Sequence, residues 1–557
     1  MATMTVIRTL ALLAAECGGS NMGNRVLLVQ NVAGGLSRSN IVKVGLGDSV
    51  NMYPETQDLN EHSTQLLMRS VDGEVPFADG LDGACRGLYR VSRGRDETGN
   101  VPALYGVFGH KLYLFDQDGT AHVIATIEST NTECRMVETG GYNSAHPHLV
   151  IVDGFSMYAV DTTIPIASQR TDFRTIELPV MPMDNSQHIK PTHVAYLYGY
   201  LVCNCEGTDA FYTSIQYPGE TLTAENEIDY DWWRLATTNN IGFITYSEWC
   251  QDITSALCSN GSKLMTFGPR SWQVFSFNDD KNNPFSSPDN AAGNIGIKAI
   301  NSLCMLGHTT IWLGSSDIGE NAVFMINDTQ LTRVSTGDVE RELAQMVHPE
   351  NAYSSIWQEH RHVFYSLTFE DSKITYVYDV TEGKWHRRAS YDESNNLTYW
   401  RYNHATFAYN RTMVASGDTL CYMDEHVFHE HDGRKILKLR RGGVLTSNDQ
   451  PFFIDSIELI CNNGQHSTKL SNLVTGALAQ PTDGELNPRV SVRYTWDGGN
   501  FSDYEDYYLG KVGDYGWTTT MWHLGYGKFF TIEISTTEEI PFSIENMKVA
   551  WSPAAWF

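Results

Sequence analysis

The fold of this 557-residue chain is decided by residues 104–120, LYGVFGHKLYLFDQDGT. A short apolar strand is followed there by a tight turn and a second, aromatic strand, which is typical of a β-hairpin. Similar units recur at 146–161, 194–216, 253–277, 302–328, 361–389 and 405–424. The mean step between units is about 51 residues, which is close to the length of four-stranded propeller blades.

The turns inside these units have the residues that tight hairpins need. They include Asp153-Gly154, Asn260-Gly261, Glu382-Gly383 and Ser416-Gly417, whose glycines can adopt a positive φ. One hairpin is marginal alone in water, whereas a closed ring of hairpins buries both faces of every blade. We therefore predict an all-β fold with a β-propeller of six or seven blades, in preference to an array of β-sandwiches.

The pattern changes after about residue 430. A basic run, EHDGRKILKLRRGG, precedes strand-like segments at 452–464, 488–510 and 528–551. These segments predict a compact antiparallel β-sandwich. The expected domains are an N-terminal arm or short helix over 1–46, the β-propeller over 47–432 and the C-terminal β-sandwich over 433–557. A helical insertion is expected at 338–349.

The charge balance argues against a protein that grips DNA. The chain has 39 basic and 66 acidic residues, a net charge of −27, whereas binding to phosphates needs a basic surface. The acidity either keeps the protein soluble or prevents adhesion in a conduit through which DNA slides. The sequence contains no apolar run of transmembrane length, so no stable membrane insertion is expected.

The sequence has no Gly-x-x-x-x-Gly-Lys-Ser/Thr loop, no Gly-x-Ser-x-Gly elbow and no His-Glu-x-x-His motif, and the remaining candidates for chemistry are weak. A metal could involve His426, His429 and His431 with Glu425 and Glu430, but surface or interface histidines are the favoured interpretation. A glycosidase needs paired carboxylates, and the acids near turns are Asp153, Asp231, Asp252 and Asp317.

A tryptophan cluster fits either blade cores or a carbohydrate surface; its members are Trp232, Trp233, Trp249 and Trp272. We predict no catalytic, cofactor-binding or metal site, and no enzyme.

Several motifs, in order along the chain, carry a resemblance to a known family. GDSVNMYPET (47–56) contains Asn51, Tyr53 and Pro54; GPRSWQVFSF (268–277) contains Trp272; and VYDVTEGKWHRRAS (377–390) contains Trp385. The most specific part is a strand, an Asp-Gly-Gly turn and a Trp-x-Leu-Gly segment, with Trp496, Asp497, Gly498, Gly499, Trp522, Leu524 and Gly525. Over about 47–557 the chain resembles the tail hub, or packaged-DNA stabilisation, proteins of short-tailed phages.

The resemblance implies a structural virion protein of the phage tail, assembled in the host cytoplasm. It implies a homohexameric ring below the portal or adaptor proteins that continues the DNA channel and retains packaged DNA. Double-stranded DNA would pass through without specific binding, and the tail needle, spikes or fibres would dock on the ring. The alternatives are a carbohydrate-binding or glycan-cleaving propeller, and a bacterial surface scaffold.

Overall fold

The computed structural model describes residues 25–29, 35–38, 46–60, 63–93, 99, 103–140, 144–181, 184–233, 243–246, 252–280, 283–288, 291–316, 320–327, 330–447, 449–464 and 487–554. Almost all regular structure in these ranges is β. The helical elements are α2 (Ile166–Asp172), α3 (Gly337–Leu343) and the 3-10 turns η2 (Ile300–Ser302) and η3 (Pro349–Asn351). The helix expected at 338–349 is α3, which Thr336 caps and which ends earlier, at Leu343. Among the helices of these ranges, none has the length and apolar character needed to span a bilayer.

Seven antiparallel sheets follow one another along the described chain. Blades 1 to 3 are β7 (Cys85–Arg90), β8 (Leu104–Phe108), β9 (Lys111–Phe115) and β10 (Ala121–Thr126); β11 (Arg135–Glu138), β12 (His148–Val152), β13 (Met157–Asp161) and β14 (Arg174–Ile176); and β17 (Val194–Leu197), β18 (Tyr200–Asn204), β19 (Ala210–Gln216) and β20 (Phe243–Tyr246). The small pair β15 (Val180–Met181) and β16 (Asp184–His188) lies between blades 2 and 3 in the sequence.

Blades 4 and 5 have an extra short strand each. They are β21 (Ala256–Asn260), β22 (Lys263–Phe267), β23 (Trp272–Phe277), β24 (Phe285–Ser286) and β25 (Ala292–Gly293); and β26 (Ile295–Ile297), β27 (Cys304–Leu306), β28 (Thr309–Ser316), β29 (Asn321–Asn327) and β30 (Gln330–Arg333). Blade 6 is β31 (Tyr353–Glu359), β32 (His362–Phe369), β33 (Ile374–Asp379) and β34 (Lys384–Tyr391), with β35 (Leu397–Tyr399) at its edge.

Blade 7 closes the ring with a strand from far away in the sequence. It contains β36 (His404–Ala408), β37 (Arg411–Ser416), β38 (Thr419–Asp424) and, outermost, β6 (Gly73–Ala78). The innermost strands of consecutive blades contact each other all round, from β7 to β36 and back to β7. The prediction of a β-propeller is thus confirmed, and the number of blades is seven, one for each predicted hairpin unit.

Apolar side chains explain why the ring is stable. Seven buried clusters lie between successive blades, and the last joins blade 7 to blade 1 through residues such as Met413, Leu420, Leu104 and Phe108. The four predicted turn glycines all have positive φ, which allows the tight hairpins inside the blades.

Two further sheets enclose a separate core. The first contains β4 (Met52–Asn60), β5 (Ser63–Ser70), β46 (Ser543–Pro553), β40 (Phe452–Cys461) and β43 (Thr519–Trp522), with β1 (Arg25–Val29) and β44 (Tyr526–Gly527). The second contains β3 (Leu46–Val50), β39 (Lys438–Arg441), β45 (Thr531–Thr536), β41 (Arg489–Thr495) and β42 (Glu505–Tyr508), with β2 (Ser37–Arg38). One apolar cluster fills the space between them, so we call this part the two-sheet unit.

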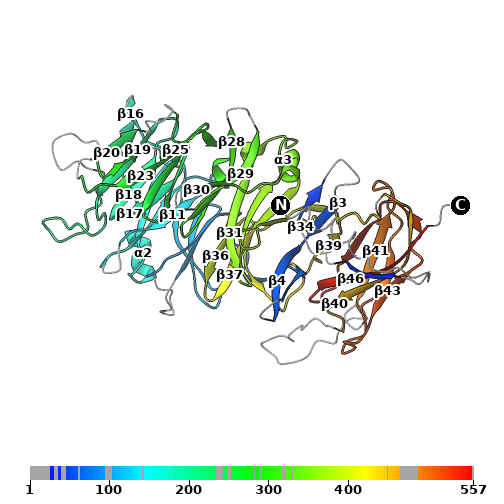
Figure 1. Cartoon of the computed structure of the whole chain (residues 1–557). Coiled ribbons are helices and arrows are strands. Elements are labelled where there is room, and N and C mark those ends of the chain that lie inside the picture. The colour runs from blue at the N-terminus through cyan, green and yellow to red at the C-terminus, as the bar shows by residue number, and fades with distance from the viewer. Residues whose placement is uncertain are drawn as a thin grey trace.

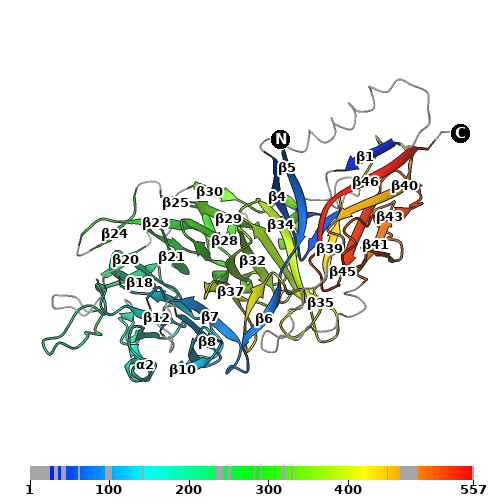
Figure 2. The ribbon, with the colours of Figure 1, turned by 90° about the horizontal axis from the view of Figure 1, so that it is seen from below.

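Residues 46–70 bridge the two parts of the molecule. The expected propeller begins at residue 47, but β5 pairs with β46 and β3 pairs with β39, and both partner strands come after residue 432. Strand β3 also pairs in parallel with β34, which makes blade 6 continuous with the second sheet. Figures 1 and 2 show the propeller and the two-sheet unit side by side, with β4 on the side of the two-sheet unit that faces the propeller. The domain boundary after 432 remains a prediction, as does the arm or helix over 1–46, of which residues 25–29 form β1 and residues 1–24 lie outside the described ranges.

Candidate functional site

The first predicted motif lies at the seam where the propeller meets the two-sheet unit. Asn51 stands between β3 and β4 with φ 52°, in the left-handed region. Its side-chain amide donates to the carbonyl oxygens of Ala389 (2.9 Å) and Leu437 (2.8 Å), and its Oδ1 accepts from the Ala389 N–H (2.9 Å). Asn51 therefore joins blade 6 to the chain entering β39 through three hydrogen bonds.

Tyr53 and Pro54 continue this seam along β4. The Tyr53 ring packs edge-on against the rings of His362 and Phe364, each with centroids 5.1 Å apart. Burial raises the pKa of Tyr53 well above its usual value. Pro54 is buried and faces Met68 on β5. These motif residues fix one part of the molecule to the other, and none of them carries reactive chemistry.

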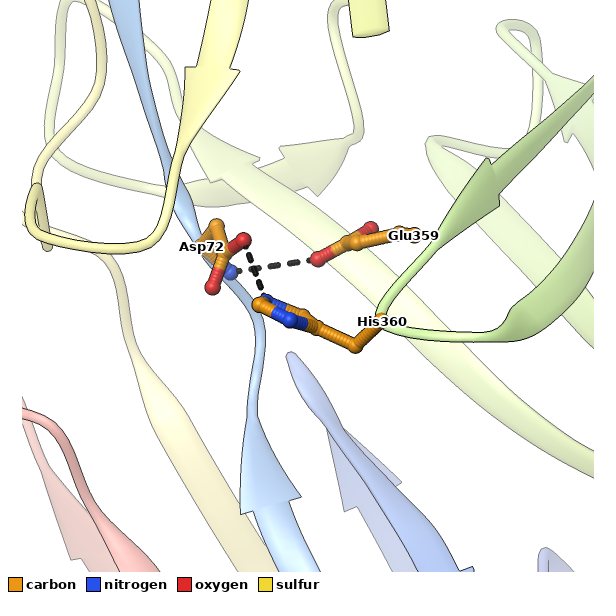
Figure 3. Close-up of side chains that lie close together, drawn as sticks. All are labelled: Asp72, Glu359 and His360. Carbon is orange, nitrogen blue, oxygen red and sulfur yellow. Dashed lines mark hydrogen bonds and ion pairs between the residues drawn. The ribbon is translucent and has the colours of Figure 1, made fainter. Parts of the chain in front are cut away.

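A cluster of charged side chains lies in the same seam, next to the strand that closes the ring. We call Asp72, Glu359 and His360 the seam cluster (Figure 3). His360 Nε2 lies 2.6 Å from Asp72 Oδ2, and Glu359 Oε1 accepts from the Asp72 N–H at 3.4 Å. Asp72 stands just before β6, whereas Glu359 and His360 belong to the hairpin between β31 and β32, so the cluster ties ring closure to blade 6.

The backbone of the hairpin that carries Glu359 and His360 is strained at its turn. His360 and Arg361 form its two-residue turn, with φ of 46° and 73°. Such turns favour Asn-Gly because a non-glycine residue in the left-handed region costs about 1–2 kcal/mol. The hydrogen bond to Asp72 raises the pKa of His360, and the Arg69 guanidinium lies 3.3 Å from the same ring.

Glu359 has its own cationic partner. Its Oε2 accepts from Arg388 Nη2 (2.7 Å) and from the Trp357 indole N–H (3.1 Å). Arg388 is fully buried, and its guanidinium lies 4.9 Å from the Trp357 ring centroid and 5.1 Å from that of Trp400. Burial acts to raise the pKa of Glu359, but the charge of Arg388 and the hydrogen bonds from Trp357 and Arg388 together outweigh it, so the pKa is lowered.

Ligand atoms of the seam cluster lie within 4.8 Å of one another, a spacing that a metal ion can use. However, Arg388 already neutralises Glu359, and Arg69 faces His360. An added cation would be repelled by both guanidinium groups. The arrangement fits an alternating network of charges that holds two elements together better than it fits a metal centre.

The sequence alone does not distinguish Asp72, Glu359 or His360 from other polar residues. Asp72 and His360 are 288 positions apart, so their contact has no local signature. One signal was present: the two-residue turn between aromatic strands reads His-Arg, where Asn-Gly is usual.

The tryptophans in the other motifs are structural. Trp385 is buried in blade 6, and its indole donates to the Val334 carbonyl at 2.8 Å. Trp272 is buried between blades 4 and 5, against Gly293. Of the other tryptophans, Trp232 and Trp233 belong to the core between blades 2 and 3, and Trp249 lies outside the described residues.

The last motif forms a loop in the two-sheet unit that its own hydrogen bonds fix. The Trp496 indole donates to the Leu524 carbonyl (2.8 Å), and Gly525 has φ 84°. The Asp497 carboxylate accepts from the N–H groups of Gly499 (2.9 Å) and Asn500 (2.8 Å), which lowers its pKa. Gly498, with φ 76°, completes this turn, while Trp522 is 64% exposed.

Two of the acids considered for glycosidase chemistry accept hydrogen bonds from nearby backbone N–H groups. Asp153 accepts from the Ser156 N–H (2.8 Å) in blade 2, and Asp252 accepts from the Arg270 N–H (2.7 Å) beside blade 4. Asp231 is exposed, and Asp317 lies outside the described residues. The structure brings none of the three described acids together as a pair.

The three histidines before the boundary have separate environments. His429 Nδ1 lies 2.8 Å from the carbonyl oxygen of Glu430, His431 Nδ1 lies 2.8 Å from the Tyr402 hydroxyl, and His426 is exposed. Within the described part of the chain, the seam cluster is the group with metal-ligand spacing.

A cavity of about 330 Å³ lies on the propeller axis and is lined by the inner strands of all seven blades. Inside it, His404 Nε2 lies 2.9 Å from Glu133. Burial acts to lower the pKa of His404, but Cys85 and Glu133 outweigh it and hold the pKa well above its usual value. The volume suits a small molecule and not a DNA duplex, whose major groove alone is about 12 Å wide.

Among the comparisons with known proteins, a family model agrees with the fold. The family model described as "Bacteriophage P22 Gp10, beta-propeller" matches residues 48–427. No curated protein matches the chain. Among solved structures, the extracellular domain of a hybrid two-component system from B. thetaiotaomicron aligns with a TM-score of 0.35 and 10% identity, over 63% of this chain and 39% of that one. BBS1N in complex with ARL6DN aligns with a TM-score of 0.34 and 10% identity, over 64% of this chain and 97% of that one.

These TM-scores are too low to carry an argument. The family match, in contrast, includes every strand of the seven blades and more than half of the chain. The chain therefore belongs to the phage stabilisation family described as bacteriophage P22 Gp10, a β-propeller.

Proposed function

We propose that this protein is a structural component of a phage tail, a hub or nozzle below the head–tail adaptor that retains packaged DNA. The observation that carries the proposal is the family match over residues 48–427. The protein acts by assembly and not by catalysis. It is assembled in the host cytoplasm and resides in the virion.

The seam supports a role as a rigid building block. Blade 6 and the second sheet of the two-sheet unit are hydrogen-bonded through β3 and β34, and Asn51 and the seam cluster reinforce this joint. A joint of this kind keeps two surfaces in fixed relation, as a component that contacts the portal or adaptor on one side and a needle, spike or fibre on the other requires.

The size of the axial cavity supports a ring of several copies, which we take to be a hexamer. In the described part of the propeller the axial cavity is too small for a duplex, so a DNA channel built by this protein would lie between copies. The net charge of −27 suits a channel along which double-stranded DNA slides without specific binding.

The experiment that tests the proposal uses phage particles assembled without this protein. We expect such particles to package DNA and then lose it, and purified protein added to them to restore nuclease-protected DNA and infectivity. Electron micrographs of restored tails should show a ring of this chain. Particles that keep their genome in its absence would contradict the proposal.

Measuring whether the protein binds or cleaves capsular or envelope polysaccharide distinguishes the carbohydrate alternative from the assembly role. Binding or cleavage that a single Asp or Glu substitution abolishes would favour it over the assembly role.

A further inference from the structure

The axial cavity of the propeller holds an unbalanced positive charge, although the chain as a whole is acidic. Its volume is about 330 Å³, and the charged side chains among the described residues that line it are Glu133, Arg135 and His404. The raised pKa of His404 keeps this side chain protonated, and it is paired with Glu133 at 2.9 Å. The charge of Arg135 is left over.

The thiols and phenols that line the cavity do not cancel this charge. Burial raises the pKa of Cys134 and Cys258 to about 12 and that of Cys304 to about 11, so all three remain neutral thiols at neutral pH. Burial also raises the pKa values of Tyr89 and Tyr353. The cavity therefore repels a metal ion and attracts an anion.

Arg135 has no acidic partner of its own. Its Nη2 donates to two neutral oxygens of blade 5, the Ile300 carbonyl (3.2 Å) and Asn301 Oδ1 (3.1 Å). No carboxylate of the described ranges forms an ion pair with Arg135. Burial lowers the pKa of Arg135, although the charge of Glu133 acts to raise it. A desolvated guanidinium without its own counter-ion is costly, so an anion beside it would be stabilising.

His193 adds a hydrogen-bond donor to the same cavity. The side chain is 2% exposed, and burial and the charge of Arg135 lower its pKa well below the usual value, so the ring is neutral. The Thr192 hydroxyl accepts from Asn204 Nδ2 at 2.8 Å. Its own proton goes to His193 Nδ1 at 3.0 Å, because the other acceptor, the Ser255 carbonyl, is 3.5 Å away. The single proton of the neutral ring is then on Nε2.

The Nε2–H group of His193 is an unused donor. It makes no hydrogen bond to any residue that the structure describes. The Ile300 carbonyl acts to raise the pKa of the ring, but its oxygen accepts from Arg135 at 3.2 Å. A buried donor without an acceptor, close to an unpaired cation, is an arrangement that a carboxylate satisfies, because its oxygens can accept from both groups.

We propose that the axial cavity binds a small organic monocarboxylate, whose oxygens accept from Arg135 and His193. The carbon part of the ligand contacts Leu88, Leu257 and Ile356, which line the cavity from blades 1, 4 and 6. This apolar wall and the single unbalanced charge favour a monocarboxylate over phosphate, which has no apolar part and more than one negative charge near neutral pH. Such binding takes place within one propeller and is independent of how copies assemble.

Calorimetric titration of the full chain with butyrate tests this binding. We expect one butyrate per chain, bound at least about tenfold more tightly than butyramide, which has the same shape without the charge, because hydrogen bonds to charged groups are the stronger ones. Butylammonium and inorganic phosphate should also bind more weakly. No binding of butyrate, equal affinities for butyrate and butyramide, or tighter binding of phosphate would overturn the proposal.

Two matched substitutions identify the cavity as the site. Arg135→Gln removes the unbalanced charge and should weaken the binding of butyrate by about tenfold or more. Lys384→Gln removes an exposed cation of β34 and should leave the affinity unchanged. Arg135→Lys keeps the charge and should bind better than Arg135→Gln, and thermal melting without ligand shows which variants are folded. Equal affinities of Arg135→Gln and Lys384→Gln would contradict the proposal.

A brominated butyrate gives a measurement that needs no variant. Crystals of the wild type soaked with bromobutyrate should show anomalous density for bromine inside the axial cavity, with the carboxylate beside Arg135 and His193. Bromine density only at other places would overturn the proposal, even if Arg135→Gln fails to fold.

Discussion

Asn51 shows how one side chain holds the propeller to the two-sheet unit. Its three side-chain hydrogen bonds reach Ala389 and Leu437, and each is worth about 1 kcal/mol. We expect Asn51→Ala to lower the free energy of unfolding by about 3 kcal/mol, or more because alanine is strained at this positive φ. Denaturant titration measures the change.

Asn410→Ala is the matched control for Asn51→Ala. Asn410 also has a positive φ (58°), but it is exposed in the turn between β36 and β37. Asn410→Ala should lower the free energy of unfolding by about 1 kcal/mol, through backbone strain alone. Equal losses in the two variants would show that the hydrogen bonds of Asn51 contribute nothing.

The ion pair between His360 and Asp72 predicts a pH dependence of stability. The hydrogen bond to Asp72 raises the pKa of folded His360, so this group contributes fully below its unfolded pKa of about 6.5. The contribution is lost as the pH rises through the folded value. We expect the wild type to lose stability relative to His360→Asn as the pH is raised from about 6 to about 9.

His360→Asn isolates this effect because asparagine tolerates the left-handed turn but does not titrate in this range. Unfolding of both proteins at a series of pH values gives the difference for the seam cluster, since groups remote from His360 contribute equally in both proteins. Parallel curves would mean that the neighbouring Arg69 and Glu359, and not the charge of His360, hold the seam.

At the scale of elements, local pairing was predictable from sequence and remote pairing was not. Each hairpin unit, such as 104–120, pairs with itself through a turn that its own residues specify, so the blades could be predicted. The closing strand β6 pairs with β38, more than 300 residues away, and its sequence GEVPFA has no adjacent partner. The number of blades stayed open for that reason.

The contacts of the seam could not be predicted from the sequence either, because they too join residues that are far apart in it. The motif residues Asn51, Tyr53 and Pro54 could be selected, but their partners in blade 6 are contributed by the fold. The sequence contains 66 acidic residues, and nothing in it shows which of them pairs with His360. Only the structure identifies Asp72 as the partner.

The start of β6 leaves no room for a side chain at Gly73. A Cβ on Gly73 would lie 2.5 Å from the His429 carbonyl oxygen and 2.7 Å from that of Val427. These are backbone atoms, so Gly73→Ala has to displace the strand that closes the ring. We expect a loss of about 1–3 kcal/mol or more, seen as a lower melting temperature.

Gly337→Ala is the control for Gly73→Ala. Gly337 opens α3, and a Cβ there would meet nothing within 4 Å. This change should leave stability unchanged or raise it by up to about 1 kcal/mol, because alanine favours helix. A melting temperature that Gly73→Ala leaves unchanged would mean that ring closure tolerates a displaced β6.

At the scale of the whole molecule, charge and cation pairing together predict that duplex DNA does not bind. The net charge is −27, and many arginines are already used within the protein, for example Arg388 with Glu359 and both Arg441 and Arg493 with Glu533. Cations that are paired within the protein are not available to displace counterions from phosphates. Anisotropy titrations at about 0.05 M salt should give a dissociation constant weaker than about 10⁻⁴ M, the weak limit of non-specific binding.

The matched comparison is between Glu533→Gln, which releases two arginines, and Glu393→Gln, which removes one exposed acid. If internal pairing is what withholds the cations from DNA, the first variant should gain more affinity than the second, and the gain should vanish with added salt. Tight binding by the wild type with a steep salt dependence would instead reveal a basic surface that the overall charge conceals, and DNA would then be held by each copy and not merely guided between copies.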